Sequence, residues 1–493
     1  MGRKYIRISF LVLSFFFLQI HVFLFSSQDF QKGEIFEKVF CADKPEQSYA
    51  LFLPSAYTPE KTWPILYAFD PGARGSVPLE HFRDAAEKYG YIVVGSNNSR
   101  NGPWSVVFRA AEAVWNDTNA RFSVDPRRVY ATGFSGGSRA AALFPKIVNH
   151  PVTGIIGIGA GLPTELKPAQ VKPAAYLGIV GLGDFNYNPM TKLDEDFDSL
   201  DVTHRLLIYE GEHAWAPQDI CTRAIEWLEV LAMKQDLRPL DKALIDEIYS
   251  KELEKARMLE ENGRVYFAVS DYEAIASLFK DWKDVQTITE KVSLLQQSSE
   301  YRKFLDDENE RREREDFYRT NFIHTFARIN NSPETIMNLA ELYSELNILP
   351  LLDKAKNKKN IDERHLASRL LAELTLHAAE EGGKNYENKD YGTAIIFHEI
   401  AAKASEFKPS RLQYIHYELA CFYALNSQKK KALKNLKLAV ENGFDRVEIM
   451  EKDEDLASIR NSAEFQKIKE DLKNKKENKK AISPDWHSSG YSK

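Results

Sequence analysis

One stretch of the chain, residues 129–143, constrains the fold more than any other. A short apolar run, Val129 to Thr132, is followed by the turn Gly133-Phe-Ser-Gly-Gly137 and then by an alanine-rich run. This order predicts a strand, a sharp turn and a helix, with Ser135 at the apex of the turn. Gly133 and Gly137 lack the Cβ atoms that would collide where the chain reverses. Ser135 is therefore a candidate nucleophile, and the N–H of Gly136 is a candidate oxyanion donor beside it.

The first half of the chain alternates short apolar runs with helical patterns. The runs predict strands at residues 47–54, 64–69, 91–94, 154–159, 174–180 and 205–209, and helices at 79–88, 104–119 and 220–234. Strands that alternate with helices favour an α/β fold, with a largely parallel sheet and helices on both of its faces. No segment between these elements is long enough to form a large lid, so we expect an open site.

A glycine-containing loop, Asp70-Pro-Gly-Ala-Arg-Gly75, follows the second predicted strand. In an α/β-hydrolase such a loop supplies the other oxyanion amides, which makes the N–H groups of Gly72 and Ala73 candidates for that role. An ordinary strand-to-helix turn is the equally weighted alternative.

Two later strands end in polar residues that complete a catalytic set. The run 174–180 leads into Asp184, and the run 205–209 leads into His213, so the chain order is Ser135, Asp184, His213. The carboxyl ends of parallel strands share one edge of a sheet, where His213 would accept the serine proton and Asp184 would orient the imidazole. Glu212 is a weaker rival for the acid. Four aromatic residues are candidates for lining a substrate pocket, with a place in the core as the alternative: Phe134, Phe185, Tyr187 and Trp215.

Residues 125–140, 184–187 and 211–217 resemble the secreted α/β-hydrolase esterases of the polyhydroxybutyrate depolymerase and feruloyl esterase type, and the resemblance covers about residues 47–234. It implies hydrolysis of carboxylic esters through an acyl-enzyme intermediate, a reaction that needs no metal or organic cofactor. Asp70-Pro-Gly72 replaces the His-Gly pair that such enzymes usually carry, which weakens any inference about the substrate. The alternatives are a serine peptidase on the same scaffold and a non-catalytic binding protein that acts through the second half of the chain.

Past residue 236 the strand signals disappear and long helical patterns begin. Small residues at Ala420, Ala432 and Ala439, together with related patterns near residues 271 and 390, resemble tetratricopeptide repeats and predict an all-α domain over 237–474. Such a domain could recruit a protein partner or the substrate. The mixed-charge run Asp306 to Asp316 predicts a solvated helix face.

The two ends of the chain and its composition suggest where the protein acts. Basic residues precede the apolar run 8–25, so residues 1–28 are predicted to be an export signal or, if uncleaved, a membrane anchor. The hydrolase domain would then span 29–236, and the polar tail 475–493 is predicted to be disordered.

A formal net charge of -6 argues against nucleic acid as a partner. Three widely spaced cysteines fit no zinc site, and Cys221 and Cys421 are expected to be buried free thiols.

Overall fold

The computed structural model describes residues 30–482 apart from 173, 337 and 409–410, with side chains to residue 474. The predicted export segment and residues 483–493 of the predicted polar tail lie outside these residues. Residues 475–482 of that tail continue the helix Ala463–Ile482, so the prediction of disorder is wrong for them. Within the described part of the chain, no helix combines the length and the hydropathy that a membrane span requires. The described cysteines, Cys41, Cys221 and Cys421, are all free thiols and buried, as predicted for the last two.

The first half of the chain forms one eight-stranded sheet. Its strands are β1 (Ile35–Phe40), β2 (Ser48–Phe52), β3 (Trp63–Phe69), β4 (Ile92–Ser96), β5 (Val124–Phe134), β6 (Gly154–Ile158), β7 (Ala175–Gly183) and β8 (His204–Glu212). The spatial order is β1-β2-β4-β3-β5-β6-β7-β8. The pairs β1–β2 and β2–β4 are antiparallel, and every other neighbouring pair is parallel. The sheet therefore confirms the predicted α/β-hydrolase class, and β8 lies at its edge.

Helices cover both faces of the sheet. They are α1 (Ser76–Tyr89), α2 (Trp104–Arg121), α3 (Gly136–Val148), α4 (Tyr187–Ser199) and α5 (Gln218–Lys234), with a short 3-10 helix at Pro168–Gln170. Successive residues of a strand point to opposite faces, so Ile155 packs with α2 and α3, whereas Ile156 packs with α1 and α5. Two hydrophobic cores result, one on each side of the sheet.

The described residues beyond α5 form helices and no strands, as predicted. The helices are α6 (Lys242–Glu261), α7 (Val265–Phe279), α8 (Gln286–Gln296), α9 (Ser299–Asn331), α10 (Leu339–Glu345), α11 (Ile348–Ala355), α12 (Ile361–Glu387), α13 (Tyr391–Ala404), α14 (Leu412–Leu425), α15 (Lys429–Glu441), α16 (Val447–Lys452), α17 (Ala457–Arg460) and α18 (Ala463–Ile482). Short 3-10 turns lie at Pro333–Thr335, Ser405–Phe407 and Glu454–Leu456. Helices α6 to α8 share the hydrophobic core of α1 and α5, and a separate core begins at Phe322 and extends to Ile468.

The small residues of the predicted repeats are fully buried. Ala420 in α14 and Ala432 and Ala439 in α15 have no exposed surface, and neither has Ala394 in α13. Helix α13 packs on α12, and α15 packs on α14. Close approach of paired helices is what the spacing of these residues predicts, and the assignment to the tetratricopeptide type stays a prediction.

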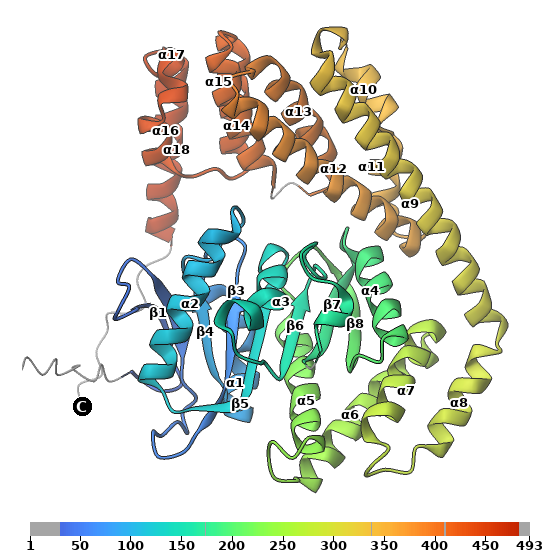
Figure 1. Ribbon diagram of the computed structural model, residues 1–493. Coiled ribbons are helices and arrows are strands. Elements are labelled where there is room, and N and C mark those ends of the chain that lie inside the picture. The colour runs from blue at the N-terminus through green and yellow to red at the C-terminus, as the bar shows by residue number, and fades with distance from the viewer. Residues whose placement is uncertain (1–29, 173, 337, 409–410, 483–493) are drawn as a thin grey trace, which may run out of the picture.

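The helical region does not extend away from the sheet but passes around its β8 edge (Figure 1). Helix α9 rises on that side, and α12 lies across the carboxyl end of the sheet and contacts β7. This arrangement corrects the prediction for the charge run 306–316, which lies within α9. Glu308, Arg311 and Glu315 are buried there, because this face of α9 packs toward the sheet and α12 instead of facing solvent.

Candidate active site

Ser135 lies at a strained turn between β5 and α3. Its backbone has φ 54° and ψ -119°, a left-handed conformation that non-glycine residues rarely adopt. The N–H of Ser135 donates to the carbonyl oxygen of Ile158 at 2.8 Å, which ties the turn to the end of β6. Strain at a half-exposed serine between a strand and a helix is typical of a nucleophile turn.

The glycines around Ser135 allow backbone segments to approach closely. A Cβ atom on Gly133 would lie 2.1 Å from the carbonyl oxygen of Gly137, and one on Gly137 would lie 1.9 Å from that of Phe69. Gly136 opens α3, so its N–H has no carbonyl partner within the helix and remains a candidate oxyanion donor.

The structure brings Ser135, His213 and Asp184 into one hydrogen-bonded chain. His213 Nε2 lies 3.0 Å from Ser135 Oγ, and His213 Nδ1 lies 2.9 Å from each carboxylate oxygen of Asp184. Asp184 is buried, whereas Ser135 and His213 are half-buried. With its hydrogen on Nδ1, the neutral imidazole donates to Asp184 and leaves Nε2 to accept the serine hydroxyl. Glu212, the rival acid, instead pairs with Lys408.

Asp184 is held by the turn that follows β7. Its N–H donates to the carbonyl of Gly181 at 3.0 Å, and its Oδ1 accepts the N–H of Asn186 at 2.9 Å. The Asn186 side chain donates to the carbonyl of Gly159 at 2.7 Å. We call residues 181–187, which run from the end of β7 to the start of α4, the aspartate turn. Residues 210–217, which run from the end of β8 to α5 and carry His213, are the histidine loop.

The structure does not support the second pair of predicted oxyanion donors. The N–H of Gly72 donates to Asp70 Oδ1 at 2.8 Å, and the N–H of Ala73 donates to the Asp70 carbonyl at 3.1 Å. Both donors are therefore used within their own turn, where Ala73 adopts a left-handed φ of 58°. The Asp70 carboxylate takes the amide of Gly72, and the backbone hydrogen bond of the turn itself takes the amide of Ala73.

Asp70 also links this loop to the histidine loop. Its buried carboxylate accepts the indole N–H of Trp215 at 2.8 Å and two hydrogen bonds from Arg74, at 2.8 and 2.9 Å. Burial raises the pKa of the Asp70 carboxyl, but the hydrogen bonds from Arg74, Trp215 and Gly72 more than offset this and hold the pKa below its usual value. Through Trp215, Asp70 thus helps to hold the loop that carries His213.

The four candidate pocket aromatics have different surroundings. The rings of Phe134 and Phe185 lie 4.6 and 4.2 Å from the imidazole of His213, centroid to centroid, and enclose it. Trp215 lies 5.8 Å from Phe134 and is nearly buried. Tyr187 does not reach the site: its ring is buried beneath the guanidinium of Arg369, which lies 4.8 Å from the ring centroid.

Sequence reasoning missed Asn101, which lies beside the nucleophile turn. A Cβ atom on Gly136 would lie 1.8 Å from Asn101 Oδ1, so the two residues are in close contact. The N–H of Asn101 donates to the carbonyl of Pro71 at 2.9 Å, which places its loop on residues 70–75. The sequence also gives no indication of the helical residues that contact the aspartate turn and the histidine loop, among them Arg319 and Arg369. No local pattern marks any of these residues, because only tertiary packing brings them to the site.

No protein-family model matches the chain, and no curated protein matches it in sequence. Among solved structures, the chain is similar to an S-formylglutathione hydrolase from Staphylococcus aureus, with 13% identity over 40% of this chain and 98% of that chain and a TM-score of 0.33. An esterase from Pyrobaculum calidifontis is 12% identical over 41% of this chain and 87% of that one, with a TM-score of 0.33. Esterase B from Lactobacillus rhamnosis is 18% identical over 42% and 90%, with a TM-score of 0.34. The candidate site is therefore assigned from its own geometry.

Proposed function

We propose that the protein is a serine hydrolase that cleaves carboxylic esters through an acyl-enzyme intermediate. The observation that carries the proposal is the hydrogen-bonded chain from Ser135 Oγ through His213 to Asp184. A serine hydroxyl is a weak nucleophile until an adjacent base takes its proton, and this geometry supplies that base with an acid behind it.

The reaction begins when Ser135 Oγ attacks the ester carbonyl carbon and its proton passes to His213 Nε2. The imidazolium that forms lies against the carboxylate of Asp184, which stabilises its charge. The N–H of Gly136 donates to the oxyanion. His213 then returns the proton to the leaving alkoxide, so that the alcohol departs and the acyl group remains on Ser135. Water, deprotonated by His213, finally releases the acid and restores the serine.

Labelling with a fluorophosphonate probe, together with hydrolysis of short p-nitrophenyl esters, tests the proposal. The probe reacts with activated serines, so the full chain should be labelled at Ser135, and Ser135→Ala should lose both labelling and turnover. Ser138→Ala is the matched control on the same helix, since the Ser138 hydroxyl donates to the Ala160 carbonyl and does not contact His213. That variant should stay labelled.

Two outcomes would contradict the proposal. Folded wild-type protein that the probe does not label would show that Ser135 is not activated. Equal ester turnover by the wild type and by Ser135→Ala would show that the hydrolysis occurs elsewhere.

A further inference from the structure

We infer that the helical region is a working part of the hydrolase site: Arg369 and Arg319 position the aspartate turn, and Lys408 and His365 position the histidine loop. The inference rests on the proposed function and extends it to residues that touch neither the substrate nor the reacting atoms. They are positioning residues that act through Asp184 and His213.

Two arginines of the helical region donate to backbone carbonyls on either side of Asp184. Arg369 Nη1, from α12, lies 2.8 Å from the carbonyl oxygen of Leu182. Arg319 Nη2, from α9, lies 3.2 Å from the carbonyl oxygen of Phe185. Because each guanidinium is a planar group of fixed geometry, these contacts define where the turn lies relative to α9 and α12.

The same arginines are themselves held by acidic residues. Arg369 is nearly fully buried and donates through Nε, at 2.9 Å, to Glu315 Oε1, which has no exposed surface. Arg319 lies 3.3 Å from Glu315 and 2.8 Å from Glu373. A buried ion pair of this kind contributes little net stability but fixes direction well, because its charges tolerate few other arrangements. The aspartate turn is thus attached to a buried cluster of ion pairs.

The histidine loop is held from the helical region in the same way. Glu212, which directly precedes His213, pairs with Lys408. Glu210 accepts from His365 Nε2 at 2.6 Å and from Arg364 Nη2 at 3.0 Å. Two carboxylates on the loop that carries the base are therefore bound to cationic or donor groups of the helical region.

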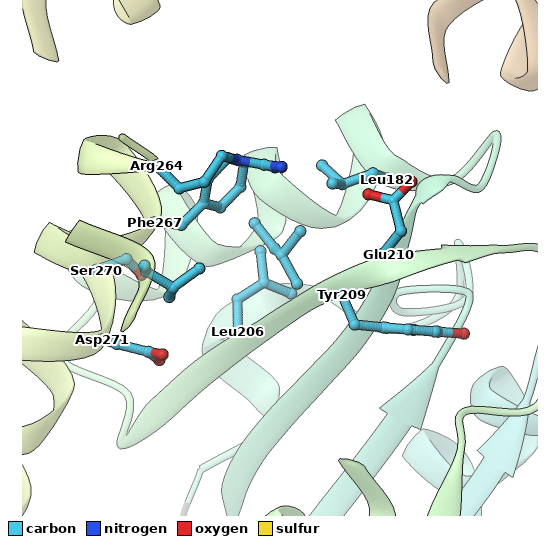
Figure 2. A pocket seen from close by; sticks show the side chains of 10 residues that line it. Leu182, Leu206, Tyr209, Glu210, Arg264, Phe267, Ser270 and Asp271 are labelled. Atoms are coloured by element: carbon cyan, nitrogen blue, oxygen red, sulfur yellow. The ribbon is translucent and has the colours of Figure 1, made fainter. Parts of the chain in front are cut away.

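These contacts add to those that Asn186, Phe134 and Trp215 already make at this corner of the sheet. The histidine loop extends from β8, an edge strand with one neighbour in the sheet. Behind it, a cavity of about 200 Å³ lies between β8 and α7 (Figure 2). Leu182 and Glu210 line that cavity, with Phe267 and Arg264 across from them. This open cavity leaves Leu182 and Glu210 without close-packed neighbours on one side, and the hydrogen bonds from the helical region limit how far the two turns can move there.

The double variant Arg319→Gln/Lys408→Gln tests the inference in the full chain. Both side chains are partly exposed, at 18% and 30%, so we expect the variant to fold. Displacing a catalytic group by about 1 Å can reduce the rate roughly 100-fold. We expect kcat for p-nitrophenyl acetate to fall about 10- to 100-fold, with KM changed less than about twofold, at a temperature where circular dichroism shows the variant to be folded. Arg314→Gln is the matched control, because Arg314 pairs with Glu363 within the helical region. Unchanged kcat in the double variant would overturn the inference.

A second readout does not depend on turnover. The imidazole N–H that His213 donates to Asp184 should give a low-field proton resonance, assigned by its loss in His213→Gln. We expect this resonance to shift or broaden in Arg319→Gln/Lys408→Gln and in Arg369→Lys, which keeps a cation beside the buried Glu315. It should stay in place in Arg314→Gln. If the wild type shows the resonance but hydrolyses no ester, the proposed function fails and the positioning inference does not. A resonance unchanged from the wild type in both Arg319→Gln/Lys408→Gln and Arg369→Lys would overturn the positioning inference alone.

Discussion

The two parts of the candidate site are held in place by different means. The nucleophile turn is local: Ser135 is fixed by a strained backbone and by glycines that let β3, β5 and α3 approach closely. The aspartate turn and the histidine loop lie at the β7–β8 edge and receive hydrogen bonds from residues more than a hundred positions later in the chain. The difference indicates that the proposed nucleophile is specified by its own motif, whereas the proposed acid and base depend on how the rest of the molecule is folded.

The largest expected effect tests whether Asp184 is the acid at this edge. Asp184→Asn should reduce kcat by about 10⁴-fold with little change in the melting temperature, because the amide cannot hold the imidazole in the reactive tautomer. Ester hydrolysis and thermal unfolding measure the two quantities.

Glu212→Gln is the control for Asp184→Asn. Since Glu212 pairs with Lys408 and not with His213, we expect a loss of at most about 100-fold, through movement of the histidine loop. An equal loss of kcat in Asp184→Asn and Glu212→Gln would mean that Asp184 has no role in catalysis that Glu212 lacks.

The second prediction concerns the ionic network that attaches α6 and α7 to the same edge. The buried Glu252 binds Arg205 of β8 and Arg223 of α5. Asp271 of α7 contacts both of these arginines as well. Glu252→Gln should lower the free energy of unfolding by about 3–5 kcal/mol at pH 7, because it leaves two buried guanidinium groups short of a partner. Urea denaturation measures the loss, and the exposed Glu254→Gln on the same helix should change stability by less than about 0.5 kcal/mol.

The stability that Glu252 contributes should depend on pH in a defined way, which a comparison of the wild type with Glu252→Gln can measure. Burial raises the pKa of the Glu252 carboxyl, but Arg205 and Arg223 overcome this and hold the pKa far below its usual value of 4.5. A depressed folded-state pKa gives stability that is fully present above the unfolded-state pKa and is lost as the pH falls toward the folded-state value. The difference in the free energy of unfolding between the wild type and Glu252→Gln should therefore be constant from pH 7 to about 5.5 and should shrink below about pH 4.5. A difference that grows in acid would contradict this assignment of charge.

The comparison also explains which parts could be predicted from the sequence. The strand–turn–helix pattern around Ser135 is contiguous, so the turn, its glycines and the helix follow from local sequence. Asp184 and His213 could be identified as candidates because each follows an apolar strand in the expected order.

Other features could not be predicted, because they depend on long-range packing. The strand β1 was missed because it is a short edge strand whose Phe36 and Phe40 stay partly or largely exposed, so no clear alternation marks it. The burial of Glu315 was missed because a charged helix face is usually solvated, and only the position of Arg369 in α12 reverses that expectation. The use of the Gly72 and Ala73 amides by Asp70 likewise depends on the conformation of the turn.

The next prediction concerns the turn around Ser135, which is the part of the site that local sequence specifies. In Gly137→Ala the new Cβ would lie 1.9 Å from the carbonyl oxygen of Phe69, a backbone atom of β3 that cannot move without disturbing the sheet. We expect the free energy of unfolding to fall by about 1–3 kcal/mol, measured by urea denaturation. Gly383→Ala is the control: it lies in α12, nothing lies within 4 Å of its added Cβ, and it should raise stability by about 0.5–1 kcal/mol. Equal stability of Gly137→Ala and wild type would show that β3 and α3 are not held together at this point.

The smallest expected effect tests whether glycine at position 136 is required by the turn around Ser135 or by the neighbouring loop that carries Asn101. In Gly136→Ala the added Cβ would lie 1.8 Å from Asn101 Oδ1, but Asn101 is exposed and can rotate away. We therefore expect a stability loss of less than about 1 kcal/mol, which Asn101→Gly should remove in the double variant. A double-mutant cycle on unfolding free energy and on kcat measures the coupling between the two residues. Strong coupling would mean that Asn101, and not the backbone of the turn, requires glycine at position 136. If the double variant is no better than Gly136→Ala, the requirement lies in the turn itself, and the nucleophile is specified even more locally than its contact with Asn101 suggests.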